Sequence, residues 1–149
     1  MDKNVPPKYC NYHPLPCTLK TKVEVELDRL IAEGFISPVT HSDWAAAIVP
    51  VLKPDDTVRI CGDYKLTVNK ATQIDPYPIP RLEDLFTALG GGQFYSKLDM
   101  TQAYSQLVLD ESSRPYTTIN THRGLFQYNR LPFGVSAAPG ISKELWSKF

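Results

Sequence analysis

Residues 45–61 read AAAIVPVLKPDDTVRIC, two apolar runs separated by a short polar segment. Both runs are rich in valine and isoleucine, which favour β-strands. The intervening Lys53-Pro54-Asp55-Asp56 has the proline and aspartate composition of a tight turn. The stretch therefore predicts a β-hairpin that carries a cation at each shoulder, Lys53 and Arg59.

The residues before this hairpin divide into an arm and a helix. Residues 1–16 hold four prolines and few periodic apolar positions, which predicts an extended N-terminal arm. From Thr18 the apolar side chains recur at helical spacing, and Thr21 with Glu24 has the spacing of a capping box. Gly34 stands where that helix is expected to end.

The residues after the hairpin alternate between helix and strand patterns. The prolines in residues 77–81 predict an extended segment. It is followed by apolar residues at helical spacing over residues 82–89, and this helix is expected to end at three glycines. Residues 116–120 and 125–130 predict a second hairpin, and residues 142–148 a weak helix. Short strands interrupted by helices predict an α+β fold with a largely antiparallel sheet.

Residues 94–104 read FYSKLDMTQAY and hold the carboxylate best suited to chemistry. The pattern predicts an apolar strand that ends at Asp99, then a short helix with Tyr104, then a further strand near residues 107–109. A carboxylate at a strand end is a candidate ligand for a hard cation such as Mg²⁺. Asp99 and Gln102 also have capping-box spacing, and the two interpretations are compatible.

Composition places few limits on function. The 149 residues suffice for one domain or part of one, and 16 basic against 16 acidic side chains give a net charge of zero. Bulk charge therefore gives no argument for a nucleic-acid, membrane or acidic partner. No apolar run approaches the roughly 20 residues needed to cross a bilayer, so no membrane partner is predicted.

The cysteines predict reduced thiols. Three of them, Cys10, Cys17 and Cys61, occur without a secretory apolar region, which predicts an intracellular protein of the cytoplasm or nucleus that is not secreted. Cys10, His13 and Cys17 lie close in sequence, but their spacing fits no usual zinc-finger pattern. Ordinary loop residues are the favoured interpretation.

Several motifs together resemble the reverse transcriptases of gypsy-type long-terminal-repeat retrotransposons. In order, they are KPDDTVRICGDYKLTVNK at residues 53–70, YPIP at 77–80, the Leu98-Asp99 strand end with Ala103-Tyr104, and NRLPFG at 129–134. The resemblance runs from about residue 15 to residue 139. It implies a fragment of an RNA-directed DNA polymerase with an extended arm (1–16), a fingers-like region (17–92) and a partial palm with the first catalytic motif (93–149).

The resemblance also implies residue roles. Such enzymes transfer nucleotides by a two-metal mechanism, with Mg²⁺ or Mn²⁺ as cofactor and with dNTP and an RNA or DNA template-primer as partners. Asp99 would be the catalytic metal ligand. The implied nucleotide-binding residues are Lys53, Arg59, Gln102, Ala103 and Tyr104, and the implied turn beside nucleotide and template is Leu131, Pro132, Phe133 and Gly134. Without the resemblance, Lys53 and Arg59 fit a charged edge hairpin. Tyr104 then fits a core aromatic, and residues 131–134 fit a tight turn.

The sequence departs from the family in two places. The aromatic-x-Asp-Asp motif that completes the family's metal site is absent, because Asp55-Asp56 lies in the hairpin turn and no aspartate follows Asp110. We therefore expect the isolated chain to be inactive and to hold no metal firmly. After Ala138-Pro139 the pattern also departs, so the last ten residues are interpreted as foreign or frame-shifted. A palm sheet without its remaining strands predicts association with the rest of a polyprotein, or self-association through an exposed edge.

Two other functions remain open. One is a non-catalytic remnant that binds RNA or an RNA–DNA hybrid, which requires Lys53, Arg59, Arg123 and Arg130 on one face. The other is a degenerate product with no selected function. The basic run formed by Arg114, His122, Arg123 and Arg130 faces either template phosphates or, more commonly for such runs, solvent on a hairpin face.

Overall fold

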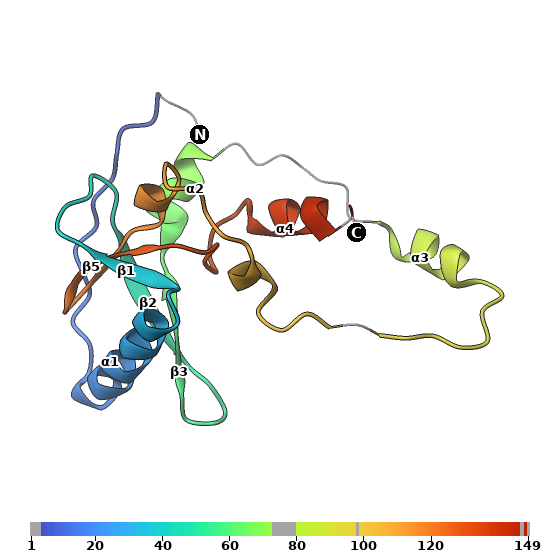
Figure 1. Cartoon of the computed structure of the whole chain (residues 1–149), viewed down its shortest axis with the longest axis horizontal. Helices are drawn as coiled ribbons and strands as arrows, with labels where there is room; N and C mark the ends of the chain where they lie inside the picture. The colour runs from blue at the N-terminus through green and yellow to red at the C-terminus, as the bar shows by residue number, and fades with distance from the viewer. Residues whose placement is uncertain (1–3, 73–79, 98, 147, 149) are drawn as a thin grey trace.

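The computed structural model describes residues 4–72, 80–97, 99–146 and 148. It contains a five-stranded sheet in the order β1-β5-β4-β2-β3. The labelled strands lie together on the left of Figure 1. β2 and β4 run parallel, and the other neighbouring pairs are antiparallel. The predicted α+β fold with a mainly antiparallel sheet is therefore confirmed. The strands are β1 (Ile36–Val39), β2 (Ala46–Leu52), β3 (Val58–Gly62), β4 (Ile119–Thr121) and β5 (Gly124–Tyr128).

β2 and β3 form the predicted hairpin. Val51 pairs with Arg59 and Leu52 with Val58, so residues 53–57 form the turn. Asp55 organises this turn, because its Oδ1 accepts hydrogen bonds from the amide and the hydroxyl of Thr57, at 3.0 and 2.6 Å. These bonds lower the pKa of the Asp55 carboxyl. The turn composition thus specifies the hairpin locally, as the sequence indicates.

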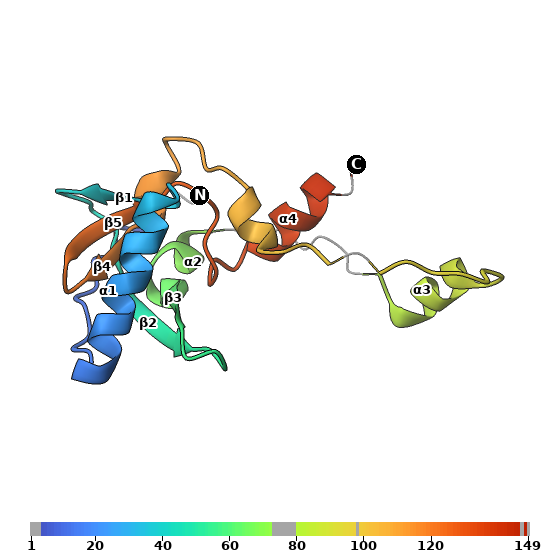
Figure 2. The ribbon, with the colours of Figure 1, turned by 60° about the horizontal axis from the view of Figure 1, so that its bottom comes forward.

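Helix α1 (Cys17–Ala32) lies across one face of the sheet (Figure 2). Its apolar stripe buries Val23, Leu27 and Leu30, and these side chains form the core together with residues of the strands. The predicted capping box is wrong, because the helix begins at Cys17, and Pro16 is the N-cap without a side-chain hydrogen bond. Gly34 ends the turn after the helix with a φ of 71°, a left-handed conformation that glycine adopts without strain.

Ion pairs tie the polar side of α1 to two turns of the sheet. Lys22 pairs with Asp56 at the hairpin tip, with Nζ and Oδ1 2.5 Å apart. Glu24 lies 3.0 Å from Nε2 of His122, and Arg123 donates to Asp28 at 2.6 Å. His122 and Arg123 therefore serve the packing of the β4–β5 turn on α1.

Tyr64 fills the centre of the core in the short 3-10 helix η1 (Tyr64–Leu66), which precedes α2 (Val68–Ala71). Its hydroxyl donates to the carbonyl oxygen of Thr117 at 2.9 Å, and burial raises the pKa of the phenol. Tyr64→Phe is expected to lower the free energy of unfolding by about 1–3 kcal/mol, because the buried carbonyl loses its donor. Urea denaturation measures this change. An unchanged midpoint would contradict the role of this hydrogen bond.

The second half of the sheet is shorter than predicted. Arg114–Thr117 form the 3-10 helix η3 with a proline in its first turn, so β4 begins only at Ile119. Val108 makes an isolated antiparallel bridge with Arg130, where a full strand over residues 107–109 is predicted. Helix α4 (Ala138–Trp146) begins four residues before the predicted start, because a proline in the first turn is compatible with a helix.

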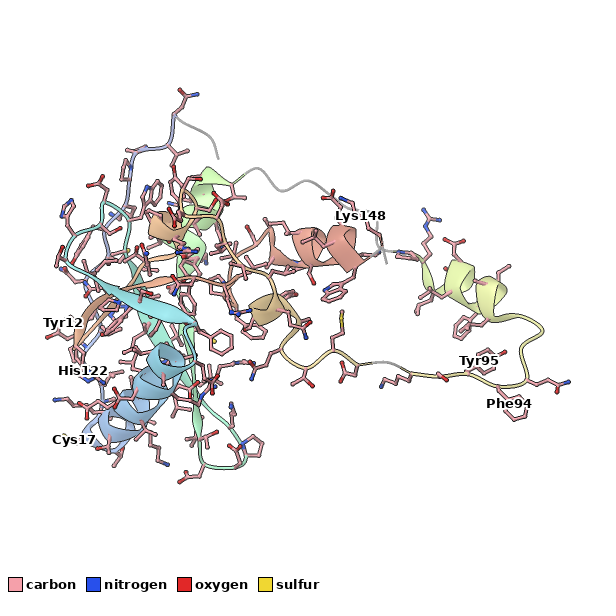
Figure 3. All side chains as sticks on the ribbon, viewed as in Figure 1. Tyr12, Cys17, Phe94, Tyr95, His122 and Lys148 are labelled. Atoms are coloured by element: carbon pink, nitrogen blue, oxygen red, sulfur yellow. The ribbon has the colours of Figure 1, made fainter. Side chains whose placement is uncertain are left out.

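Residues 80–97 extend away from the sheet and are here called the arm (Figure 1). Helix α3 (Leu82–Leu89) forms as predicted, but all its side chains are exposed and it lies far from the sheet (Figure 1). Phe94 and Tyr95 lie on the same arm (Figure 3). Of the strand predicted to end at Asp99, the described residues 94–97 and 99 are not in a strand. Within the described part of the chain, no strand lies beside them to accept their backbone hydrogen bonds, which a stable strand requires.

The sheet combines strands from both sides of residue 92. β1, β2 and β3 come from residues 36–62, whereas β4 and β5 come from residues 119–128, and all five belong to one sheet. The division into residues 1–16, 17–92 and 93–149 stays a prediction. Within the described part of the chain, no helix is long and apolar enough to cross a membrane. The extended entry predicted at residues 77–81 falls mostly outside the described residues.

Candidate nucleotide-binding site

A cavity of about 230 Å³, here called the cationic pocket, opens between α1, the β2–β3 hairpin and the segment that follows β5. Arg29 of α1, Lys53 and Arg59 of the hairpin and Arg130 after β5 line it. Glu26 of α1 also lines it. Four cations and one carboxylate therefore surround a single cavity in a chain with no net charge.

The cations of this pocket differ in their partners. Arg29 is neutralised, because its Nε and Nη2 donate to the two carboxylate oxygens of Glu26 at 2.8 Å, and its Nη1 donates to Glu33 at 2.7 Å. These bonds raise the pKa of Arg29. Lys53, Arg59 and Arg130 make no ion pair with any described residue. They leave positive charge available for an anionic ligand.

Phe133 connects the hairpin to the segment after residue 101. The guanidinium carbon of Arg59 lies 5.2 Å from the centroid of the Phe133 ring, within the range of a cation–π contact. On the same ring, Tyr104 packs edge-on, with centroids 5.2 Å apart and an interplanar angle of 63°. Phe133 thus joins three side chains that are distant in sequence, those of residues 59, 104 and 133. This group is here called the stack.

A second cavity, here called the apolar hollow, adjoins the cationic pocket at Phe133. It is lined by Met100, Ala103 and Tyr104, and by residues of α4 that include Trp146. The apolar hollow shares Gln102 and Phe133 with the cationic pocket. A ligand with an anionic end and a flat ring would therefore find complementary surfaces in the two adjoining cavities.

The turn Leu131–Gly134 is held against the hairpin and α2. Leu131 is buried, and Gly134 has a φ of 96°. Asn69 of α2 donates from Nδ2 to the Gly134 carbonyl at 2.8 Å and accepts from the Ser136 amide at 2.8 Å. Asn69 lies inside the motif at residues 53–70, but the sequence does not indicate that it supports this turn.

Three of the implied nucleotide-binding residues, Gln102, Ala103 and Tyr104, lie in or directly before the 3-10 helix η2 (Ala103–Gln106). Gln102 precedes it with φ 51° and ψ 48°, a left-handed conformation, and the helix has no side-chain cap. The interpretation of Asp99 and Gln102 as a capping box is therefore wrong. Lys53, Arg59, Gln102 and Phe133 all line the cationic pocket, so the structure brings together residues that the sequence separates.

Asp99 stands apart from this group. Its side chain is exposed, lines neither cavity and makes no hydrogen bond or ion pair with another described residue. Among the residues with described positions, no three or more His, Cys, Asp or Glu side chains gather as a metal site. Cys10, His13 and Cys17 therefore form no such site either. The three cysteines are free thiols. The side chains of the described residues do not fit a two-metal centre.

Residues 51–149 match the family model for "Reverse transcriptase (RNA-dependent DNA polymerase)". The chain belongs to the reverse transcriptase family. The match extends to residue 149, so the last ten residues lie inside it, and their interpretation as foreign is not supported. The departure from the family pattern after residue 139 is therefore local.

Relatives of this reverse transcriptase segment occur in much longer proteins. "Uncharacterized protein K02A2.6" of Caenorhabditis elegans is 39% identical over 99% of this chain, which spans 12% of that protein. The "Retrovirus-related Pol polyprotein from transposon opus" of Drosophila melanogaster is 31% identical over 93% of this chain, which spans 14% of that polyprotein. The segment thus corresponds to a small part of such proteins.

Solved structures share the fold. The native prototype foamy virus protease–reverse transcriptase has a TM-score of 0.83 at 20% identity, covering 97% of this chain and 19% of that one. A foamy viral protease–reverse transcriptase in complex with an RNA/DNA hybrid has a TM-score of 0.77 at 19% identity, with the same coverage of both chains. The reverse transcriptase fold of this segment is therefore confirmed.

Proposed function

We propose that this reverse transcriptase segment belongs to a gypsy-type long-terminal-repeat retrotransposon polyprotein and supplies that polymerase's sites for dNTP and template-primer. The ordered motifs at residues 53–70 and 129–134 and the similarity to Pol polyproteins from Drosophila transposons support the assignment. Genomic sequence downstream of the codon for Phe149 tests the origin. An open frame that runs into an aromatic-x-Asp-Asp motif is expected, and an unrelated sequence there would contradict it.

The observation that carries the nucleotide-binding proposal is the stack of Arg59, Phe133 and Tyr104, whose Phe133 lines both cavities. The cationic pocket suits a triphosphate, because arginine can donate to two phosphate oxygens at once. The adjoining apolar hollow suits a sugar and base. A deoxynucleoside triphosphate has this division of charge and apolar surface.

The resemblance to reverse transcriptases implies a role for each candidate residue, and we propose these roles for this chain. Lys53 and Arg59 bind the triphosphate, and the amides of Gln102 and Ala103 offer further donors to it. The ring of Tyr104 lies under the sugar and leaves no room for a ribose 2′ hydroxyl. The turn Leu131–Gly134 forms the wall toward the template.

The donor set does not support nucleotidyl transfer by this chain alone. Asp99 is a single exposed carboxylate, and Mg²⁺ or Mn²⁺ at a two-metal centre requires several carboxylate oxygens. We propose Asp99 as one ligand that carboxylates from another part of the polymerase complete. The 149-residue chain is expected to extend no primer with dNTPs and Mg²⁺ or Mn²⁺. A labelled-primer gel assay tests this, and metal-dependent extension that Asp99→Asn abolishes would contradict it.

Lys53, Arg59 and Arg130 also support nucleic-acid binding without catalysis, because the three unpaired cations line one pocket. Arg123, by contrast, pairs with Asp28 and contributes no free charge. We expect an RNA–DNA hybrid to bind with a log affinity that falls linearly with log salt, with a slope of about −2 to −3 for three phosphate contacts. Fluorescence anisotropy at several salt concentrations measures the slope. Affinity independent of salt would contradict this role.

The exposed apolar stripe of α3 supports a further contact with the rest of the polyprotein or with a second copy. Leu82 and Phe86 are 68% and 71% exposed, far more than apolar side chains of an amphipathic helix that has its partner. Sedimentation velocity at increasing protein concentration separates these possibilities for the purified chain. Concentration-dependent association that Phe86→Asp removes indicates self-association, whereas a monomer indicates that the partner lies elsewhere in the polyprotein.

A further inference from the structure

Arg130 links two elements beside the cationic pocket. Its guanidinium carbon lies 5.4 Å from the ring centroid of Phe35, the residue that follows the turn after α1. Its Nη1 donates to the carbonyl oxygen of Ser105 in η2, at 3.2 Å. Because Arg130 has no carboxylate partner among the described residues, these contacts define the position of the guanidinium group.

The two ends of η2 differ in their attachment to the rest of the structure. On its C-terminal side, the amide of Leu109 donates to Asn129 and the amide of Leu131 donates to Leu107, both at 2.9 Å. These bonds attach residues 107–109 to the chain around Arg130. On its N-terminal side, residues 99–102 are exposed and continue into the arm. The bond from Arg130 to Ser105 is therefore an anchor between the sheet and the turn that carries Tyr104.

We propose that Arg130 is a positioning residue for the nucleoside end of the bound nucleotide. By holding the Ser105 carbonyl, Arg130 fixes η2 so that Gln102 and Tyr104 face the cavities that adjoin Phe133. The triphosphate end depends instead on Lys53 and Arg59. The inference rests on the proposed function. It assigns the nucleoside end and the triphosphate end of one ligand to different residues.

The test compares two ligands on the complete 149-residue chain in metal-free buffer. Isothermal titration with dTTP and with inorganic tripolyphosphate is carried out for the wild-type chain and for Arg130→Met. The variant is expected to weaken dTTP binding about tenfold and to weaken tripolyphosphate binding by a smaller factor, because Lys53 and Arg59 remain in the pocket. Arg130→Lys keeps a donor for Ser105 and is expected to restore part of the dTTP affinity.

Arg114→Met is the matched control. Arg114 also donates to a backbone carbonyl, from Nε to Leu109 at 3.2 Å, but it lines neither cavity. The substitution removes the same charge and the same kind of bond. We expect it to leave the ratio of the two affinities unchanged. A ratio that shifts as much as in Arg130→Met would overturn the proposal.

A second readout does not depend on ligand binding. NMR relaxation of the free chain is expected to show increased picosecond–nanosecond motion of the Gln102–Tyr104 amides in Arg130→Met, with a changed carbonyl shift at Ser105 and unchanged core signals. Unchanged motion would overturn the positioning role, and an equal loss of both ligands would assign Arg130 to phosphate binding instead. If the wild-type chain binds neither ligand, the proposed function fails, while the relaxation data still decide whether Arg130 holds η2.

Discussion

Arg59→Ala is expected to weaken the binding of a deoxynucleoside triphosphate about 10- to 100-fold. Arg59 carries one of the unpaired positive charges of the cationic pocket, and the contact with Phe133 orients its guanidinium. A hydrogen bond to a charged group contributes about 1.5–3 kcal/mol, and 1.4 kcal/mol corresponds to tenfold in affinity. Isothermal titration with dTTP measures the change. Tripolyphosphate should lose affinity to the same extent, because Arg59 is assigned to the phosphates.

Arg123→Ala is the control for this experiment. Arg123 lies outside both cavities and pairs with Asp28, at an exposed site where ion pairs contribute little to stability. The substitution lowers the net charge by the same amount as Arg59→Ala. Equal losses of affinity in the two variants would mean that the ligand responds to overall charge, and the assignment of the pocket would be wrong.

Gly134→Ala is expected to lower the free energy of unfolding by about 2–4 kcal/mol, the upper part of the range for point substitutions. Two effects add at this position. The φ of 96° strains any residue with a Cβ atom, and that Cβ would lie 2.7 Å from the carbonyl oxygen of Gly62. A backbone oxygen in β3 cannot turn aside as a flexible side chain can. Urea denaturation gives the change, and nucleotide affinity is expected to fall as the turn shifts.

Gly124→Ala separates strain from collision. Gly124 has a φ of 107°, but nothing lies within 4 Å of the Cβ that an alanine would add. This variant therefore reports the conformational cost alone. We expect it to lose less stability than Gly134→Ala and to keep its nucleotide affinity. Equal costs at the two glycines would show that the contact between the turn and β3 is not tight.

Local sequence patterns are enough to predict an element whose formation depends on one turn or on one apolar stripe. The hairpin around Asp55 is predicted correctly, since the aspartate forms its turn with the next two residues. Helix α1 is predicted because its apolar spacing matches the buried residues Val23, Leu27 and Leu30. The start of α1 is predicted less well, because a plausible capping box at Thr21 lies inside the helix.

The strand predicted to end at Asp99 shows what a local pattern cannot decide. Its residues have strand-forming side chains, but a strand also needs a neighbour for its backbone groups, and no described element pairs with residues 94–97. The same reasoning applies to α3, whose stripe forms a helix without a surface to cover it. Both features depend on contacts between distant segments, which spacing along the chain does not reveal.

The candidate site is likewise only partly predictable. Motif order indicates that Lys53, Arg59 and Tyr104 belong together, and the structure places two of them in one pocket and links the third through Phe133. Asn69 and Arg130 lie inside quoted motifs, but the motifs do not indicate their hydrogen bonds, because each bond joins a backbone group far away in the chain. Supporting contacts of this kind require the structure.

We propose that the two cavities lined by Phe133 form one nucleotide-binding site. NMR titration of the ¹⁵N-labelled chain with dTTP tests it most directly, because each backbone amide reports its own surroundings. The amides of Arg59, Gln102, Ala103, Phe133 and Gly134 are expected to shift together along a single binding curve. Shifts confined to other parts of the chain, or no shifts at millimolar dTTP, would contradict the claim.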